Sequence, residues 1–211
     1  MKAAKVRPVA ALFVDARGSY AELPGVDLWD EQRDARRYFG PHPVVAHPPC
    51  SRWCRLAGLV EARWGHKRGD DEGCFAFALD AVRRWGGVLE HPAYSDAWRA
   101  FGLPRPPRHG GWQRGPCDGW STHVEQGRYG HPARKATWLY VYGVSHLPPL
   151  KWGFRHAHAS RALVSWCENH VQSGEPRPRI GKRAAAATPK RFRDVLLSIA
   201  RSVDFVADSA A

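Results

Sequence analysis

The sequence has no long hydrophobic run, and its cysteines form no recognisable framework. No stretch approaches 18 apolar residues, and residues 1–20 lack the apolar segment of a signal peptide. We therefore expect a cytoplasmic protein that does not enter a membrane. The five cysteines are odd in number and include no CxxC pair. This pattern argues against a disulfide scaffold and against a zinc finger, so we expect reduced thiols and no bound metal.

Acidic residues are scarce relative to basic ones. The 211 residues include 32 Lys and Arg against 20 Asp and Glu, which gives a formal net charge of +12. An excess of this size favours a polyanionic partner, and nucleic acid is the one we expect. The ten tryptophans add rings that can stack on bases or stiffen a pocket.

Short apolar segments alternate with helix-forming segments along the chain. We expect strands over residues 9–15, 44–46, 87–91, 122–131 and 137–143, and helices over 28–39, 70–85, 94–102 and 188–203. Residues 103–121 show no period and predict a long functional loop. The alternation predicts an α/β fold, with a mainly parallel sheet and helices on both faces.

The domain organisation follows from composition. Residues 1–171 are expected to form the α/β domain, and residues 172–187 a basic, mobile linker. Residues 188–211 would then supply an amphipathic helix and a tail, so that the chain ends in a basic extension.

Two predicted strands run directly into proline. One gives "VVAHPPC" and delivers Cys50 after Pro49, and the other gives "GVLEHP" and delivers Glu90. Carboxyl ends of neighbouring parallel strands share one edge of a sheet, where ligands gather. We therefore predict that Cys50 and Glu90 share a cleft, with His47 and His91 lining it.

Later segments add basic and polar candidates. In the strand predicted over 122–131, Gln126 and Arg128 occupy alternate positions and would face the same cleft. A basic and aromatic group suits nucleic-acid backbone and an unstacked base. Its members are Arg105, Arg108, Trp112, Arg114, Arg134 and Lys135.

A cysteine, a glutamate and an arginine in one cleft match a known chemistry. A thiolate that adds to carbon 6 of a pyrimidine makes carbon 5 nucleophilic. A carboxyl group at the N3 edge offsets the charge that develops on the ring, and an arginine lowers the pKa of the thiol and stabilises the adduct. We expect Cys50, Glu90 and Arg128 in these roles.

The chain resembles the DNA cytosine 5-methyltransferases, as a compact, phage-type member. Their Pro-Cys loop matches Pro49-Cys50, and their Glu-Asn-Val strand matches Glu90, although His91-Pro92 follows it here. Their Gln-x-Arg-x-Arg strand matches Gln126-Gly127-Arg128. The resemblance implies a reduced class I methyltransferase-like, Rossmann-like fold and base flipping. It also implies DNA as substrate, in the cytoplasm of a bacterial or phage-infected cell.

The same resemblance implies a cofactor site for S-adenosyl-L-methionine. "ALFVDARGSY" is similar to a shortened form of the family's aromatic, Gly-rich cofactor loop, which places Phe13 and Gly18 at the cofactor. "VDLWDE" would supply the acidic residue for the ribose hydroxyls, at Asp27 or Asp30.

Two other functions stay open from the sequence. The first is a pyrimidine-modifying enzyme for free nucleotides, since thymidylate synthases also use a Pro-Pro-Cys nucleophile. The second is a non-catalytic DNA-binding module on a decayed methyltransferase fold. The net charge of +12 argues against the first of these, and the short cofactor loop favours the second.

Overall fold

The computed structural model describes residues 6–54, 57–153 and 180–204, which fold around one seven-stranded mixed sheet. The strands are β1 (Val9–Leu12), β2 (Val26–Trp29), β3 (Val44–Ala46), β4 (Gly87–Pro92), β5 (Trp112–Arg114), β6 (Trp120–Glu125) and β7 (Ala136–Tyr142), in the spatial order β2-β1-β3-β4-β7-β6-β5. The strands from β2 to β4 are parallel, whereas β7, β6 and β5 each pair antiparallel with their neighbours. The α/β class is confirmed, but the parallel arrangement holds only for the first half of the sheet.

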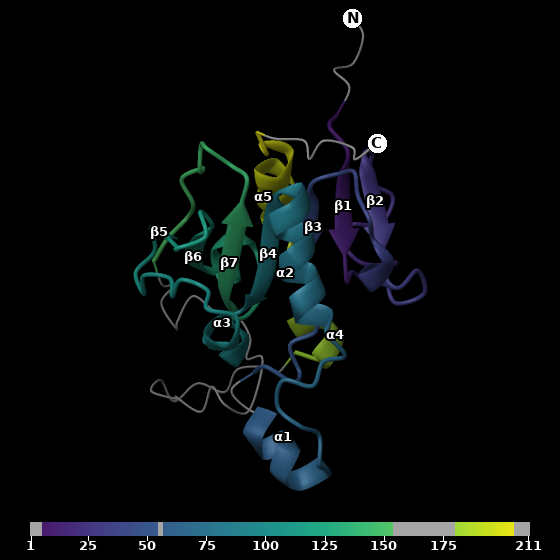
Figure 1. The fold of residues 1–211 in the computed structure, drawn as a ribbon, viewed down its shortest axis with the longest axis vertical. Coiled ribbons are helices and arrows are strands. Elements are labelled where there is room, and N and C mark those ends of the chain that lie inside the picture. The colour runs from purple at the N-terminus through teal and green to yellow at the C-terminus, as the bar shows by residue number, and fades with distance from the viewer. Residues whose placement is uncertain (1–5, 55–56, 154–179, 205–211) are drawn as a thin grey trace, which may run out of the picture.

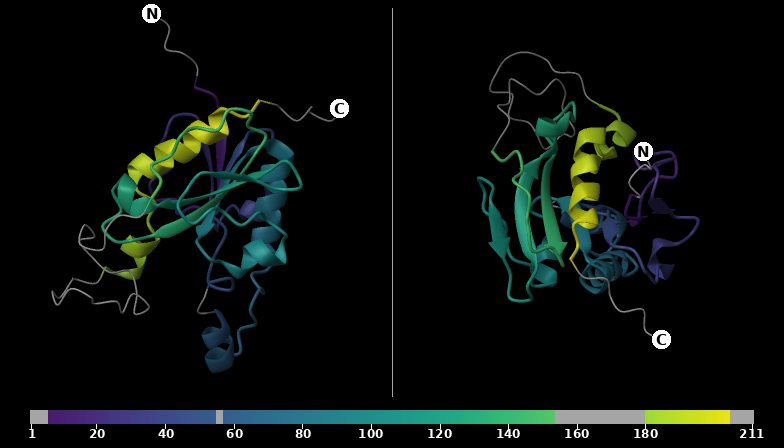
Figure 2. Two further views of the ribbon diagram at one scale, coloured as in Figure 1. Left: turned by 90° about the vertical axis from the view of Figure 1, so that its left-hand side faces the viewer. Right: turned by 90° about the horizontal axis from the view of Figure 1, so that it is seen from above.

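Helices cover both faces of the sheet. They are α1 (Ala57–Trp64), α2 (Cys74–Trp85), α3 (Asp96–Ala100), α4 (Lys182–Ala186) and α5 (Lys190–Arg201), with 3-10 turns η1 (Ala35–Arg37) and η2 (Gln126–Tyr129). Helix α2 crosses the front of the sheet in Figure 1 and α5 lies behind it, and Figure 2 shows the two helices on opposite sides. The predicted C-terminal helix thus supplies one layer of the core.

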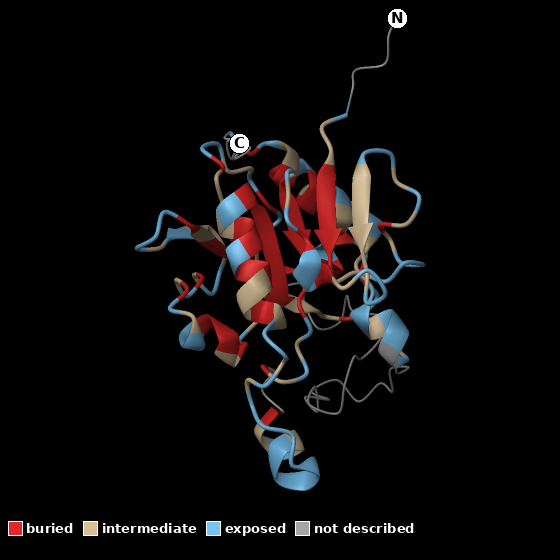
Figure 3. Cartoon of the chain, turned by 45° about the vertical axis from the view of Figure 1, so that its right-hand side comes forward, coloured by how far each residue is buried: buried red, intermediate tan, exposed pale blue. Residues whose placement is uncertain are grey.

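The central strands are apolar because both of their faces are covered. All residues of β1 and β3 are buried, and Figure 3 shows these strands in the colour of buried residues. Ala10 and Leu12 pack with the α2 layer, whereas Val9 and Ala11 pack with the α5 layer. This run without polar alternation is typical of parallel strands between two helical layers.

Helix α2 connects β3 to the parallel strand β4, as predicted. Asp71 stabilises its start, because its carboxylate accepts hydrogen bonds from the backbone N–H of Gly73 and Phe75 and from the indole of Trp53. The helix ends at Gly86, and Gly87 then packs against β3. A Cβ on Gly87 would lie 2.0 Å from the carbonyl oxygen of Val44, so only glycine allows the two backbones to approach this closely.

The helix expected over residues 28–39 is wrong. Residues Val26–Trp29 form β2 and pair in parallel with β1, and only the short turn η1 follows. The stretch has helix-forming composition, but Val26 and Leu28 pack against the α5-side core. Pairing at the edge of the sheet therefore outweighs local propensity.

Two expectations for the antiparallel half of the sheet are also wrong. The stretch 103–121 is not a continuous loop, because it contains β5 and the start of β6. The strand expected over 122–131 ends at Glu125, where the chain turns into η2. Gln126 is therefore buried while Arg128 is exposed, and the two do not face the same way.

The expectations for the segment around residues 171–187 concern a part of the chain that the structure describes only in part. The domain boundary expected at 171 lies outside the described residues. Within the expected linker 172–187, the described part contains α4.

Candidate active site

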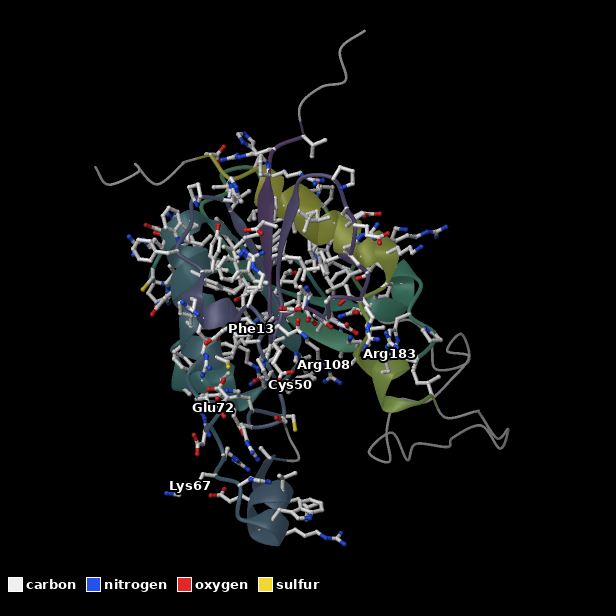
Figure 4. The ribbon with its side chains drawn as sticks, turned by 90° about the vertical axis from the view of Figure 1, so that its right-hand side faces the viewer. Phe13, Cys50, Lys67, Glu72, Arg108 and Arg183 are labelled. Carbon is white, nitrogen blue, oxygen red and sulfur yellow. The ribbon has the colours of Figure 1, made fainter. Side chains whose placement is uncertain are left out.

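The parallel half of the sheet has one point where successive connections leave in opposite directions. The chain passes from β1 to β2 on one side and from β3 to β4 on the other, while β1 and β3 are direct neighbours. In open α/β sheets, the crevice outside the carboxyl ends of such strands binds ligands. Phe13 and Cys50 follow these two strands and lie at the same end of the molecule in Figure 4.

His47 links the loops that leave β1 and β3. Its backbone N–H donates to the carbonyl of Leu12 over 3.0 Å, which extends the pairing of the two strands by one residue. Its ring Nε2 lies 2.9 Å from the hydroxyl of Tyr20, and its Nδ1 lies 2.9 Å from Oε2 of Glu90. The imidazole therefore connects the loop after β1 to the end of β4.

Both carboxylate oxygens of Glu90 have a hydrogen-bond partner within the protein, and only 7% of the residue is exposed. His47 meets Oε2, and the side-chain amide of Gln126 donates to Oε1 over 3.0 Å. The same amide nitrogen donates to Oγ1 of Thr137 over 2.9 Å. Strands β3, β4 and β7 and the turn η2 thus converge on one carboxylate.

The Glu90 carboxylate is ionised. Burial opposes its charge, but the hydrogen bond from His47 and the positive charges of His47 and Lys135 outweigh this effect and lower the pKa of Glu90 to about 2. Burial, followed by the negative charge of Glu90, raises the pKa of Tyr20 well above its usual value. Tyr20 therefore keeps its proton. His47 donates from Nδ1 to the ionised Glu90, and its Nε2 shares a hydrogen bond with the Tyr20 hydroxyl.

Cys50 lies on a turn directly after Pro48 and Pro49. Its carbonyl accepts hydrogen bonds from the N–H groups of Trp53 and Cys54, at 3.0 and 2.9 Å. Burial and the negative charge of Glu90 raise the pKa of the Cys50 thiol to about 11. Burial and the charge of Glu90 together keep the thiol protonated at neutral pH.

Lys135 is the cation that faces this pair. Its ammonium donates to the carbonyls of Ala186 and Ala187, at 2.8 and 3.2 Å, where α4 ends. Burial lowers the pKa of Lys135, whereas the charges of Glu90 and Cys50 raise it. The positive charge of Lys135 in turn lowers the pKa of both partners. Lys135, expected to contact phosphate, is instead bonded to the end of α4 and acts electrostatically on the thiol and the carboxylate.

The other expected pocket residues are placed differently. His91 is on the opposite face of β4, fully buried among aromatic rings, with Phe75 at 5.1 Å and Trp98 at 6.3 Å between ring centroids. Burial lowers the pKa of His91 to about 4, so the ring is neutral. Arg128 is exposed on η2, and no contact between Arg128 and the Cys50–Glu90 pair is seen. The cation that acts on the thiol is instead Lys135.

Of the expected cofactor residues, Phe13 and Gly18 follow β1 and Asp30 follows β2, whereas Asp27 lies within β2, opposite Ala10 of β1. Phe13 has a positive φ of 58° and packs against the α2-side core. Gly18 closes a turn in which its N–H donates to the carbonyl of Asp15 over 2.8 Å. Asp27 accepts from the indole of Trp29 at 2.8 Å and from Arg33 at 2.7 Å, and Asp30 accepts from the backbone N–H of Arg33 at 2.9 Å.

The expected nucleic-acid contacts fall into separate groups. Arg105 and Arg108 line one open depression. Arg114 pairs with Asp118 at 2.6 Å, and Arg134 pairs with the buried Glu125 at 3.2 Å. Trp112 donates from its indole to the carbonyl of Pro148 over 3.1 Å and packs on the α5-side core.

Sequence reasoning missed Tyr20, Thr137 and the position of Lys135. Tyr20 lies eight residues after β1, and its partner His47 is 27 residues away, so no local spacing predicts their contact. Thr137 is a polar residue that is completely buried within the apolar strand β7. A polar residue at a buried position needs a hydrogen-bond partner. The threonine within this apolar run was therefore the one signal available in the sequence.

Comparisons of the chain with protein-family models, with curated proteins and with solved structures find no match. Across residues 6–54, 57–153 and 180–204, no group of three or more His, Cys, Asp and Glu side chains is placed to hold a metal ion. None of the helices in the described part of the chain has the length and apolar character that a membrane span requires. The site must therefore be interpreted from its own geometry.

Proposed function

We propose that this protein modifies a pyrimidine base of DNA at carbon 5, most simply a cytosine, by covalent addition of Cys50 to carbon 6. In the same proposal, the sheet is a reduced, Rossmann-like methyltransferase fold. The observation that carries the proposal is the position of Cys50 and Glu90 relative to two neighbouring parallel strands. Cys50 follows β3, and Glu90 lies directly after the part of β4 that pairs with β3. His47, three residues before Cys50, contacts the Glu90 carboxylate, and the charge of Glu90 acts on the Cys50 thiol.

The proposed addition uses these two groups in sequence. As the sulfur–carbon 6 bond forms, the thiol proton passes to the Glu90 carboxylate, and the electron pair of the carbon 5–carbon 6 bond moves into the ring. Protonated Glu90 then donates its proton to N3, which neutralises the developing charge. Carbon 5 then attacks an electrophile from a donor. Loss of the carbon 5 proton to water restores the carbon 5–carbon 6 double bond as the sulfur–carbon 6 bond breaks, with its electron pair remaining on sulfur. N3 returns its proton through Glu90 to the thiolate, so the enzyme regains its starting state.

His47, Gln126 and Lys135 support this chemistry. His47 and Gln126 hold one carboxylate oxygen each, so the carboxylate keeps one orientation toward the base. Lys135 offsets part of the cost of forming a thiolate, because its charge lowers the pKa of Cys50. It takes the place that the resemblance gives to Arg128.

S-adenosyl-L-methionine is the donor that the resemblance implies, and Asp27, one of the two expected acidic residues, fits it poorly. Both carboxylate oxygens of Asp27 are already engaged, by Trp29 and by Arg33. No regular helix follows β1, so no helix N-terminus faces the crevice there. The proposed addition to carbon 6 uses only this chain's own groups, whereas the electrophile for carbon 5 comes from a separate donor.

Two alternatives make different predictions. An enzyme for free nucleotides needs no extended basic surface, whereas this chain has a net charge of +12. A non-catalytic binding module needs no paired thiol and carboxylate, whereas Glu90 stays buried and ionised beside Cys50. A buried charge is costly to maintain, and this cost favours a catalytic role.

The test is mass analysis of nucleosides from the DNA of cells that express the protein. We expect a cytidine derivative with added mass on the base, absent with Cys50→Ala and retained with Cys54→Ala. A modified base that persists with Cys50→Ala would overturn the proposal. Modified free nucleotides alongside unmodified DNA would favour the first alternative, and DNA binding without any modified nucleoside would favour the second.

A further inference from the structure

Helix α1 projects from the body of the protein. It lies below the sheet in Figure 1, and most of its residues carry the colour of exposed residues in Figure 3. Two large apolar side chains on it face solvent, since Leu59 is 62% exposed and Trp64 is 57% exposed. An exposed tryptophan at the end of a projecting helix is unusual, because this residue normally finds a partner surface.

The root of this projection is fixed directly beside Cys50. Trp53, three residues after the thiol, is buried and donates from its indole to Asp71 over 2.7 Å. The backbone N–H of Gly69 donates to the carbonyl of Arg52 over 2.9 Å. Both ends of the projecting segment are therefore tied to the loop that carries Cys50, and anything bound along α1 lies next to the candidate site.

The projection is basic toward its tip and its return. The stretch "RWGHKR" (63–68) contains Arg63, Lys67 and Arg68 and no acidic residue. The guanidinium carbon of Arg63 lies 5.0 Å from the centre of the Trp64 ring. This combination of positive charge and an aromatic face suits a nucleic-acid strand.

The basic character continues onto the body of the protein. An open depression at the root of the projection is lined by Arg68, Tyr94, Asp96, Arg105 and Arg108. The lining contains three arginines and one acidic residue. That acid, Asp96, pairs with Arg68 at 3.2 Å. Tyr94 adopts a positive φ of 65° directly after β4, and strain of this kind concentrates at functional sites.

We propose that residues 57–68, here called the α1 arm, form a DNA-contact arm in which Trp64 stacks on bases next to the base that reaches Cys50. This inference rests on the proposed function. Removing a base from the helix leaves unstacked neighbours, and an aromatic or apolar side chain stabilises such a gap. Arg63 and Lys67 contact the phosphates of the same stretch, and the strand continues into the depression around Arg68.

The test uses the full-length protein and a duplex in which 2-aminopurine, in a single mismatch, replaces the base that leaves the helix. Affinity is measured by fluorescence anisotropy, and base unstacking by the 2-aminopurine signal. We expect Trp64→Ala to weaken binding about tenfold or more, because stacking of one base is worth about 1–3 kcal/mol. The 2-aminopurine signal should fall as well. Single-stranded RNA of the same sequence serves as the competing ligand.

Phe39→Ala is the matched control. Phe39 is also an exposed aromatic residue, 72% exposed, and it also carries an arginine on its ring, with Arg84 at 4.3 Å. It precedes β3, whereas Cys50 follows this strand, and it packs against Trp85 at the C-terminal end of α2. Phe39 therefore lies at the end of the strands opposite to the candidate site. We expect Phe39→Ala to bind like the wild type, and circular dichroism to show both variants folded.

The phosphate contacts have a separate readout. Arg63→Gln and Lys67→Gln should each reduce the slope of log affinity against log salt by about 1, whereas Arg84→Gln should leave it unchanged. Wild-type affinity and unstacking in Trp64→Ala would overturn the proposal, and so would preference for RNA. Failure of the proposed function has a different result: the arm variants would still lose affinity, but no modified base would form with any variant.

Discussion

Nδ1 of His47 lies 2.9 Å from Oε2 of Glu90, and the two residues come from the ends of neighbouring parallel strands. The pair lies at the point where β1 and β3 diverge, and Tyr20 extends it to the loop after β1. The hydrogen-bonded pair is nearly buried, with side-chain exposures of 12% for His47 and 9% for Glu90. It fixes the orientation of the Glu90 carboxylate, so its properties can be tested independently of any substrate.

The first prediction concerns stability in acid. The pKa of Glu90 is about 2 in the folded protein, against an ordinary value of 4.5. A depressed pKa contributes stability above the unfolded value, and this contribution is lost as the pH falls from about 4.5 toward 2. Glu90→Gln removes the titration, so its free energy of unfolding should depend less on pH in this window, by at most about 1.4 kcal/mol per pH unit.

Urea unfolding between pH 5 and pH 2.5 measures this difference. At pH 7, Glu90→Gln should also be less stable by about 1–3 kcal/mol, because His47 loses a charged partner. Glu31→Gln removes an exposed carboxylate and is the control, with no change expected in the pH dependence. Parallel curves for wild type and Glu90→Gln would show that Glu90 titrates normally.

The second prediction concerns the reactivity of Cys50. Because only the thiolate is alkylated and the pKa of Cys50 is about 11, its reaction with iodoacetamide should accelerate about tenfold per pH unit from pH 8 to pH 10. Glu90→Gln should speed the reaction at fixed pH, since the charge of Glu90 raises this pKa. Lys135→Gln should slow it, since the charge of Lys135 lowers this pKa.

Peptide mapping by mass spectrometry separates Cys50 from the other cysteines in this experiment. Arg134→Gln is the control for Lys135→Gln, because it removes a neighbouring charge that pairs with Glu125. Its rate should match the wild type. A plateau of the Cys50 rate below pH 9, or the same effect from both charge removals, would contradict the electrostatics of the site.

The third prediction concerns the strand that positions Glu90. Gly87 has a φ of +125°, and a Cβ there would lie 2.0 Å from the carbonyl oxygen of Val44. Gly87→Ala should therefore lower the free energy of unfolding by about 3 kcal/mol or more, through strain and the separation of β4 from β3. Gly130 has a φ of +104°, and a Cβ there would meet nothing within 4 Å. Gly130→Ala should therefore lower the free energy of unfolding by only about 1–2 kcal/mol. Equal losses in thermal unfolding would contradict this packing.

The sequence predicted the β3–α2–β4 unit well because its signals are local, whereas it missed β2. Strands β3 and β4 are short apolar runs that end at proline, and α2 has an apolar stripe and a capping aspartate. The prediction that the strands leading to Cys50 and Glu90 are parallel neighbours followed from this pattern alone and is confirmed. The amphipathic helix α5 was predicted for the same reason, and Phe192, Leu196 and Ile199 are buried on it.

The antiparallel half was predicted less well because its contacts are not local. β5 has three residues and owes its conformation to pairing with β6, which no period in the sequence indicates. The end of β6 at Glu125 separates Gln126 from Arg128, and this changes which cation reaches the site. Lys135 occupies that place because α4, about 50 residues later, binds its ammonium. Such a contact cannot be predicted from spacing.

The most direct test of the central claim is a covalent trap on DNA. A duplex carrying 2-pyrimidinone, or 5-fluorocytosine with S-adenosyl-L-methionine present, should form an adduct that survives denaturation, because the sulfur–carbon 6 bond is not readily reversed in these bases. Mass spectrometry should map the adduct to Cys50. We expect no adduct with Cys50→Ala, although DNA binding persists, and a normal adduct with Cys54→Ala. An adduct that persists with Cys50→Ala, or no adduct while the wild type remains bound to the DNA, would contradict the account.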